Sequence, residues 1–167
     1  MISTEVIKPK IKFIDVNDAD ENLQMQIRDW RNSAEVKKYF QIDYIDVDTH
    51  KNWLKEINKK NSSVRAFIIN FEGNNIGLIY LHKIDKEKKK ADIGIYIYNT
   101  ELRGRGIGSS CIEFLKDYAF NTLYLNTLYL EVLKDNMRAI NLYEKYGFKQ
   151  VSLRDNVYIY KTEKAGA

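Results

Sequence analysis

The stretch Arg103-Gly104-Arg105-Gly106-Ile107-Gly108 points to the fold of this chain of 167 residues. The chain has eight glycines, and three of them lie within these six residues, between a strand-like run and a helix-like run. Glycine lets the backbone adopt unusual dihedral angles and lets another group approach it closely. A glycine-rich turn that leads into a helix presents backbone N–H groups and the positive end of the helix dipole to one anion. The stretch therefore predicts a binding site for a diphosphate.

Two well-known phosphate loops do not match this stretch. A P-loop ends in Gly-Lys-Ser or Gly-Lys-Thr, and this stretch lacks that ending. A dinucleotide fingerprint needs a further glycine after Gly106, where this chain has Ser109, and an acidic residue about twenty residues on. What remains is the pattern Arg-x-x-Gly-x-Gly, from Arg103 to Gly108.

A second motif lies further along the chain. It consists of Leu130-Glu131-Val132-Leu133, then Asn136, Ala139 and Ile140, and finally Leu142-Tyr143-Glu144-Lys145-Tyr146-Gly147-Phe148. With the glycine stretch it resembles the GNAT superfamily of N-acetyltransferases, in the family's order and separation, over Ala91 to Leu153. The resemblance implies one domain over residues 1–167 with an α+β (mixed α/β) fold. In that fold a central twisted mixed sheet of about six to seven strands is flanked by helices.

The apolar periodicity predicts the same kind of layered structure. Strands are expected at Lys10–Val16, Val64–Phe71, Ile76–Ile84, Ala91–Tyr98, Leu128–Leu133, Phe148–Leu153 and Val157–Tyr160. Helices are expected through Leu23 and Trp30, through Val36 and Phe40, through Trp53 and Ile57, after the glycine stretch, and after Asn136. Asp18 or Asp20 is expected to cap the first helix, and Asp48 or Thr49 the third.

The resemblance implies acetyl-CoA as co-substrate and no metal. It implies that Tyr96, Ile97 and Tyr98 line the cofactor where their strand separates from its neighbour. It also implies that the pyrophosphate is held by backbone N–H groups of Gly104, Arg105, Gly106, Ile107, Gly108 and Ser109. Arg103 and Arg105 either add charge there or lie in solvent. Asn136 matches an asparagine that contacts the cofactor arm, and it is also a typical helix N-cap.

For the chemistry, the resemblance implies direct attack of an amine on the thioester carbonyl. Tyr143 matches the family tyrosine that protonates the departing thiolate, and a phenol with a pKa of about 10 stays protonated at neutral pH. The alternative is a tyrosine that only packs under the sheet. Glu131 is the candidate base, because it interrupts an apolar run and matches the base of bacterial ribosomal-protein alanine acetyltransferases. An ordered water and Asp92 are the alternative bases.

The acceptor is predicted from a short segment near the N-terminus. Trp30-Arg31-Asn32, followed by Val36 and Phe40, resembles acetyltransferases that act on nucleotide-linked amino sugars. This implies that Arg31 pairs with a nucleotide diphosphate and that Trp30 stacks on a base or sugar. Otherwise Trp30 is a core residue and Arg31 closes a helix. The first choice of acceptor is an amino-sugar nucleotide. The alternatives are the N-terminal amine of a ribosomal protein, a polyamine, and a module that only binds acetyl-CoA.

The bulk composition restricts the partners. The net charge of +4 suits a small anionic ligand and is too weak to argue for nucleic acid. The single cysteine, Cys111, excludes an internal disulfide and gives no zinc pattern. Met1–Lys10 lacks the apolar region of a signal peptide, and no apolar run approaches the roughly 20 residues that span a bilayer. We therefore expect a cytoplasmic enzyme that binds a small-molecule amine or a peptide N-terminus, without nucleic acid or membrane. A homodimer is the candidate assembly.

Overall fold

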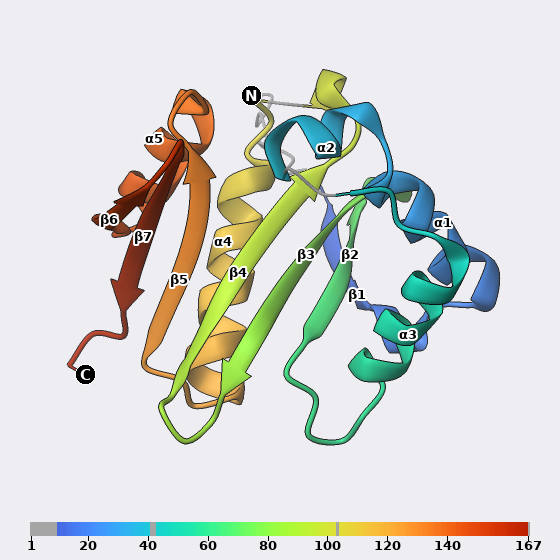
Figure 1. Ribbon diagram of the computed structural model, residues 1–167, viewed down its shortest axis with the longest axis horizontal. Coiled ribbons are helices and arrows are strands. Elements are labelled where there is room, and N and C mark those ends of the chain that lie inside the picture. Colours follow the sequence, from blue (N-terminus) through green and yellow to red (C-terminus); the bar gives the residue numbers. More distant parts are fainter. Residues whose placement is uncertain (1–9, 41–42, 103, 167) are drawn as a thin grey trace, which may run out of the picture.

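The centre of the molecule is a seven-stranded mixed sheet, as expected from the sequence. The computed structural model describes residues 10–40, 43–102 and 104–166 (Figure 1). The strands are β1 (Ile11–Asp15), β2 (Arg65–Phe71), β3 (Asn74–Asp85), β4 (Lys90–Ile97), β5 (Thr127–Leu133), β6 (Lys149–Arg154) and β7 (Val157–Glu163). Their order across the sheet is β1-β2-β3-β4-β5-β7-β6, and every neighbouring pair is antiparallel except β4 and β5.

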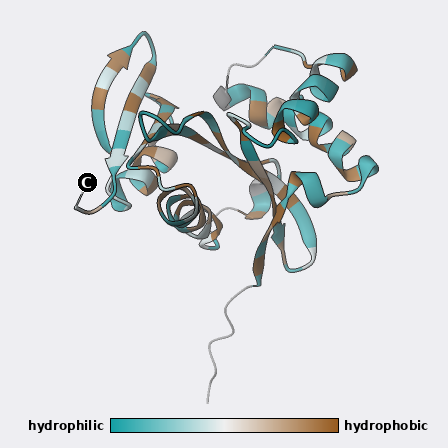
Figure 2. Cartoon of the chain, turned by 90° about the horizontal axis from the view of Figure 1, so that it is seen from below, coloured by the Kyte–Doolittle hydropathy of each residue, from teal (hydrophilic) through white to brown (hydrophobic). Residues whose placement is uncertain are grey.

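Helices cover both faces of the sheet. They are α1 (Glu21–Arg31), α2 (Ala34–Phe40), α3 (Val47–Ile57), α4 (Ile107–Asp117) and α5 (Met137–Lys145). Seen from below, α4 lies on one side of the sheet and α1–α3 lie on the other (Figure 2). Within the described ranges, no helix combines the length and the apolar character that crossing a bilayer requires.

Two apolar cores follow from this arrangement, because successive residues of a strand point to opposite faces. The larger core contains Ile112 and Leu115 of α4 and Leu128 of β5. The second core contains Ile27 of α1 and Ile57 of α3, packed on the other face of the sheet. Residues of β4 divide between the two cores and thereby connect them.

Side chains cap four of the described helices, α1, α2, α3 and α5, at their N-terminal ends. Asp20 caps α1 as predicted, and its Oδ1 accepts a hydrogen bond from the Leu23 amide at 2.8 Å. Asp46 caps α3 through the Thr49 amide at 2.7 Å. The expectation of Asp48 or Thr49 as the cap was therefore wrong. Asp46 stands three residues before Thr49, as an N-cap side chain requires, whereas Asp48 and Thr49 already lie in the first turn of the helix.

The sheet is split between β4 and β5. These strands pair in only three rows, Lys90–Thr127, Ala91–Leu128 and Asp92–Tyr129. All other neighbouring strands pair over five or seven rows. Beyond Asp92 and Tyr129 the two strands diverge, with α4 behind the opening (Figure 1). The split predicted at this point of the sheet is present, and it leaves backbone groups of both strands without a strand partner.

Candidate functional site

A cavity of about 600 Å³ occupies the opening between β4 and β5. Residues 93–97 of β4 and residues 131–133 of β5 form two of its sides. The glycine loop and the start of α4 contribute Gly104 and residues 106–109. The segment that leads into α5, together with α5 itself, contributes residues 135–139, Leu142 and Tyr143, and α2 contributes Glu35 and Val36. The cavity thus brings together elements from both halves of the chain.

The start of α4 is open toward this cavity. Gly104 and Gly106 have φ angles of +80° and +77°, in the left-handed region that favours glycine. Gly106 is the N-cap of α4, where no side chain of the described residues caps the helix and no acidic residue stands in the first turn. The first N–H groups of a helix have no acceptor within it, so this end can bind an anion. Arg105 is exposed beside it, and Arg103 lies outside the described residues.

Gly108 is a glycine for a different reason. A Cβ atom added there would lie 2.7 Å from Cδ2 of Leu142, so the missing side chain lets α4 pack closely against α5. Ser109 follows it at the cavity wall, together with Ile107.

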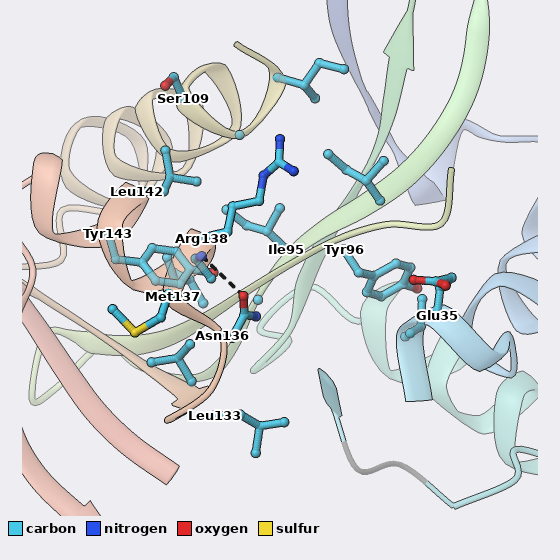
Figure 3. Close-up of a pocket in the computed structure, with 18 of the residues that line it drawn as sticks. Glu35, Ile95, Tyr96, Ser109, Leu133, Asn136, Met137, Arg138, Leu142 and Tyr143 are labelled. Carbon is cyan, nitrogen blue, oxygen red and sulfur yellow. Dashed lines mark hydrogen bonds between the residues drawn. The ribbon is translucent and has the colours of Figure 1, made fainter. Parts of the chain in front are cut away.

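The three residues that were predicted to line the cofactor, two at the end of β4 and one just after it, separate in the structure. Tyr96 and Ile97 line the cavity, and Tyr96 lies beside Glu35 of α2 (Figure 3). Tyr98 lies outside the cavity, where its ring stacks on Trp30 at 5.0 Å and its hydroxyl donates to the Asn75 carbonyl.

The predicted acceptor residues also lie outside the cavity lining. Trp30 is 8% exposed and belongs to the second core. Arg31 stacks on Trp53 at 4.5 Å, and its buried Nη1 has no hydrogen-bond partner among the described residues. Burial lowers the pKa of the Arg31 guanidinium, whereas the nearby Tyr96 and Tyr80 phenols act in the opposite direction. The Nη1 group of Arg31 is therefore a buried hydrogen-bond donor without an acceptor among the described residues.

One wall of the cavity carries Tyr143 and Asn136 (Figure 3). Tyr143 is 8% exposed and packs edge-on against Phe148 at 5.7 Å. Burial raises the pKa of the Tyr143 phenol, and the neighbouring Tyr80 and Cys111 raise it further. Asn136 caps α5, and its Oδ1 accepts from the Ala139 amide at 3.3 Å. Asn136 is therefore an N-cap that also faces the cavity.

Glu131 lines the cavity from β5 and is engaged in an ion pair. Its Oε1 lies 2.7 Å from Nη2 of Arg154 on β6, and both side chains are about half exposed. Asp92, the weaker candidate base, lies 3.6 Å from the Lys83 ammonium.

Sequence reasoning missed Glu35, which lines the opposite wall. A glutamate in the first turn of a helix is typical of dipole stabilisation, so nothing in its sequence context indicated a site.

Other kinds of chemistry find little support here. Burial raises the pKa of the Cys111 thiol to about 12, so this side chain is a protonated core residue rather than a nucleophile. Across the described ranges, no group of three or more His, Cys, Asp or Glu side chains could hold a metal ion.

Comparisons with known proteins agree with this geometry. Residues 12–149 match the family model described as an acetyltransferase (GNAT) domain. Acetyltransferase PseH of Campylobacter jejuni is 29% identical over 136 residues, which is 81% of each chain. The crystal structure of Campylobacter jejuni PseH in complex with acetyl coenzyme A superimposes with a TM-score of 0.73 at 25% identity, and covers 93% of this chain and 100% of that one. Spermidine N(1)-acetyltransferase of Escherichia coli is 31% identical over 117 residues, which is 70% of this chain and 62% of the relative, so the match spans less than two thirds of that protein.

Proposed function

Because the chain belongs to the GNAT acetyltransferase family, we propose that it transfers the acetyl group of acetyl-CoA to a primary amine. The observation that carries this proposal is the open start of α4 at one end of the cavity between β4 and β5. A diphosphate fits the uncapped N–H groups of the helix. The amide groups of an extended arm fit the backbone groups that β4 and β5 leave unpaired beyond Asp92 and Tyr129.

The donor thioester would supply an activated acetyl carbon, and the residues of this chain would handle the protons. The attacking amine must lose a proton, and the departing sulfur must gain one. Tyr143 suits the second task, because its phenol stays protonated when burial raises its pKa. Glu131 suits the first task once its carboxylate leaves Arg154. An ordered water remains the alternative base.

For the acceptor, we favour an amino-sugar nucleotide. Support comes from the Trp30-Arg31-Asn32 segment and from the unused Nη1 donor of Arg31. A guanidinium with an N–H group that lacks an acceptor is stabilised by a phosphate, which can accept two parallel hydrogen bonds. Trp30 supports this site by packing rather than by stacking on the ligand, because it is buried against Tyr98.

A polyamine is the second candidate, and one observation favours it. Glu35 and Glu131 both line the cavity, and carboxylates attract a cationic chain. The Escherichia coli relative carries spermidine in its name. The N-terminal amine of a ribosomal protein stays a third prediction on the strength of Glu131.

A thiol-release assay with acetyl-CoA tests these alternatives side by side. Amino-sugar nucleotides, N-terminal peptides and spermidine would each be supplied as acceptor. Arg31→Gln should impair turnover of an amino-sugar nucleotide and spare spermidine, whereas Glu35→Gln should do the opposite. Binding of acetyl-CoA in calorimetry without turnover of any acceptor would favour a binding module instead of an enzyme.

A further inference from the structure

Tyr80 of β3 lies across β4 at the place where the sheet opens. It is paired in register with Gly94 of β4. A Cβ atom added to Gly94 would lie 2.1 Å from Cζ and 2.3 Å from the hydroxyl oxygen of Tyr80. The tip of the phenol therefore occupies the space above Gly94 where any other residue would have its side chain. Gly94 lines the cavity and stands two residues after Asp92, the last β4 residue that pairs with β5.

The Tyr80 ring is held in this position by its neighbours. It packs edge-on against His82 at 5.4 Å and tilted against Tyr96 at 6.3 Å. The Arg31 guanidinium acts electrostatically on the phenol and opposes the effect of burial, which raises its pKa to about 12. The hydroxyl therefore stays protonated and has few positions available to it.

Two hydroxyl groups approach the opening from opposite faces of the sheet. Tyr143 belongs to the core that contains α4, whereas Tyr80 packs with the core that contains α1 and α3. The two phenols are close enough for Tyr80 to affect the ionisation of Tyr143. Tyr143 lines the cavity, whereas Tyr80 reaches it by covering Gly94, which lines it from β4. Two hydroxyls at one opening suit the two sides of an acyl transfer, the leaving sulfur and the attacking nitrogen.

We propose that Tyr80 is the acceptor-side hydroxyl of the reaction centre. Its oxygen accepts a hydrogen bond from an N–H of the attacking amine, which turns the nitrogen lone pair toward the thioester carbon. In the reaction a carbon–nitrogen bond forms, the carbon–sulfur bond breaks, one amine proton leaves to the base, and the sulfur receives a proton from Tyr143. Tyr80 neither gains nor loses a proton in this step, and it acts by orienting the attacking amine. This inference rests on the proposed acetyl transfer.

The role proposed for Tyr80 can be distinguished from that of Tyr143 by experiment. Tyr80→Phe keeps the ring over Gly94 and removes only the hydroxyl. Loss of one hydrogen bond should lower kcat/KM for the acceptor about ten-fold. The KM for acetyl-CoA and the slow hydrolysis of acetyl-CoA without acceptor should stay as in the wild type. Tyr143→Phe should lower both hydrolysis and transfer, because water and amine require the same leaving group.

Tyr118→Phe is the matched control. Tyr118 packs against Phe67 at 5.0 Å, away from the cavity lining. Gly94→Ala provides a second variant, because its methyl group displaces the Tyr80 tip while the hydroxyl is retained. It should also reduce kcat/KM for the acceptor. If Tyr80→Phe behaves like Tyr118→Phe, or if it lowers hydrolysis as strongly as transfer, the inference is wrong. If the wild type acetylates no acceptor, the proposed function itself fails.

Discussion

Gly106→Val tests whether the start of α4 binds the diphosphate of acetyl-CoA. Gly106 has a φ angle of +77° and caps the helix with no side chain. A Cβ atom added there would meet nothing within 4 Å. The Cβ atom therefore has open space, and the expected effects come from the backbone conformation and from the side chain placed where the anion would bind.

Both effects have a predictable size. A residue other than glycine in the left-handed region costs roughly 1–2 kcal/mol, which in a domain of this length lowers Tm by about 2–8 °C. If the side chain disrupts two N–H bonds to the charged phosphates, at about 1.5 kcal/mol or more each, binding weakens by about 3 kcal/mol. That corresponds to a loss of affinity of about 100-fold.

Gly73→Val is the matched control. Gly73, in the turn between β2 and β3, has a φ angle of +87° and likewise has nothing within 4 Å of an added Cβ. Thermal unfolding should show a similar fall in Tm for both variants, because both incur the same backbone strain. Calorimetric titration with acetyl-CoA should show weakened binding in Gly106→Val alone. Equal affinity of the two variants would refute the assignment of the diphosphate site.

Three further predictions concern single side chains. Tyr143→Phe should lower kcat by about 100-fold or more and leave the affinity for acetyl-CoA unchanged in calorimetry. Because burial raises its pKa, the wild-type kcat should show no decline from ionisation of Tyr143 up to about pH 10. Glu131→Gln should depress the rate most at low pH, where removing a proton from the amine is hardest, and a pH profile like that of the wild type would leave water as the base. Burial lowers the pKa of His50, whose Nε2 lies 2.7 Å from the Gln24 carbonyl oxygen. The unfolded chain therefore binds this proton at a higher pH than the folded chain, and the stabilisation present above about pH 6.5 is lost as the pH falls below it. Denaturant titrations of His50→Gln should show a weaker fall in unfolding free energy between about pH 7 and pH 5, and an unchanged fall would contradict the argument.

Features that depend on neighbouring residues could be predicted from the sequence. The alternating runs predicted β2 and β3 to within two residues at each end. The turn between them consists of Glu72 and Gly73, which both have positive φ angles, and Asn74 already pairs with Phe71. A two-residue turn with both φ angles positive matches the twist of the strands.

Features that depend on distant pairing could not be predicted in this way. Trp30 was expected to contact the acceptor, and it is buried against Tyr98, which follows β4 and lies far from Trp30 in the sequence. The ion pair of Glu131 with Arg154 depends on β7 lying between β5 and β6. The position of Tyr80 depends on the register that places it opposite Gly94. Periodicity indicates which face of an element is apolar, but it carries no information about which side chain of another element lies opposite.

The three-row junction between β4 and β5 has a consequence for cooperativity. It divides the sheet into a block of β1 to β4 and a block of β5 to β7, each continuous in the chain. In the absence of ligand the second block should open as a partly independent folding unit, which hydrogen exchange would detect as a separate class of amides. A ligand that lies along the junction and binds only the closed form adds about 2.7 kcal/mol at a concentration 100 times its Kd. The donor molecule would then serve as the missing part of the sheet, and its loss after each turnover would loosen the attachment of the C-terminal block.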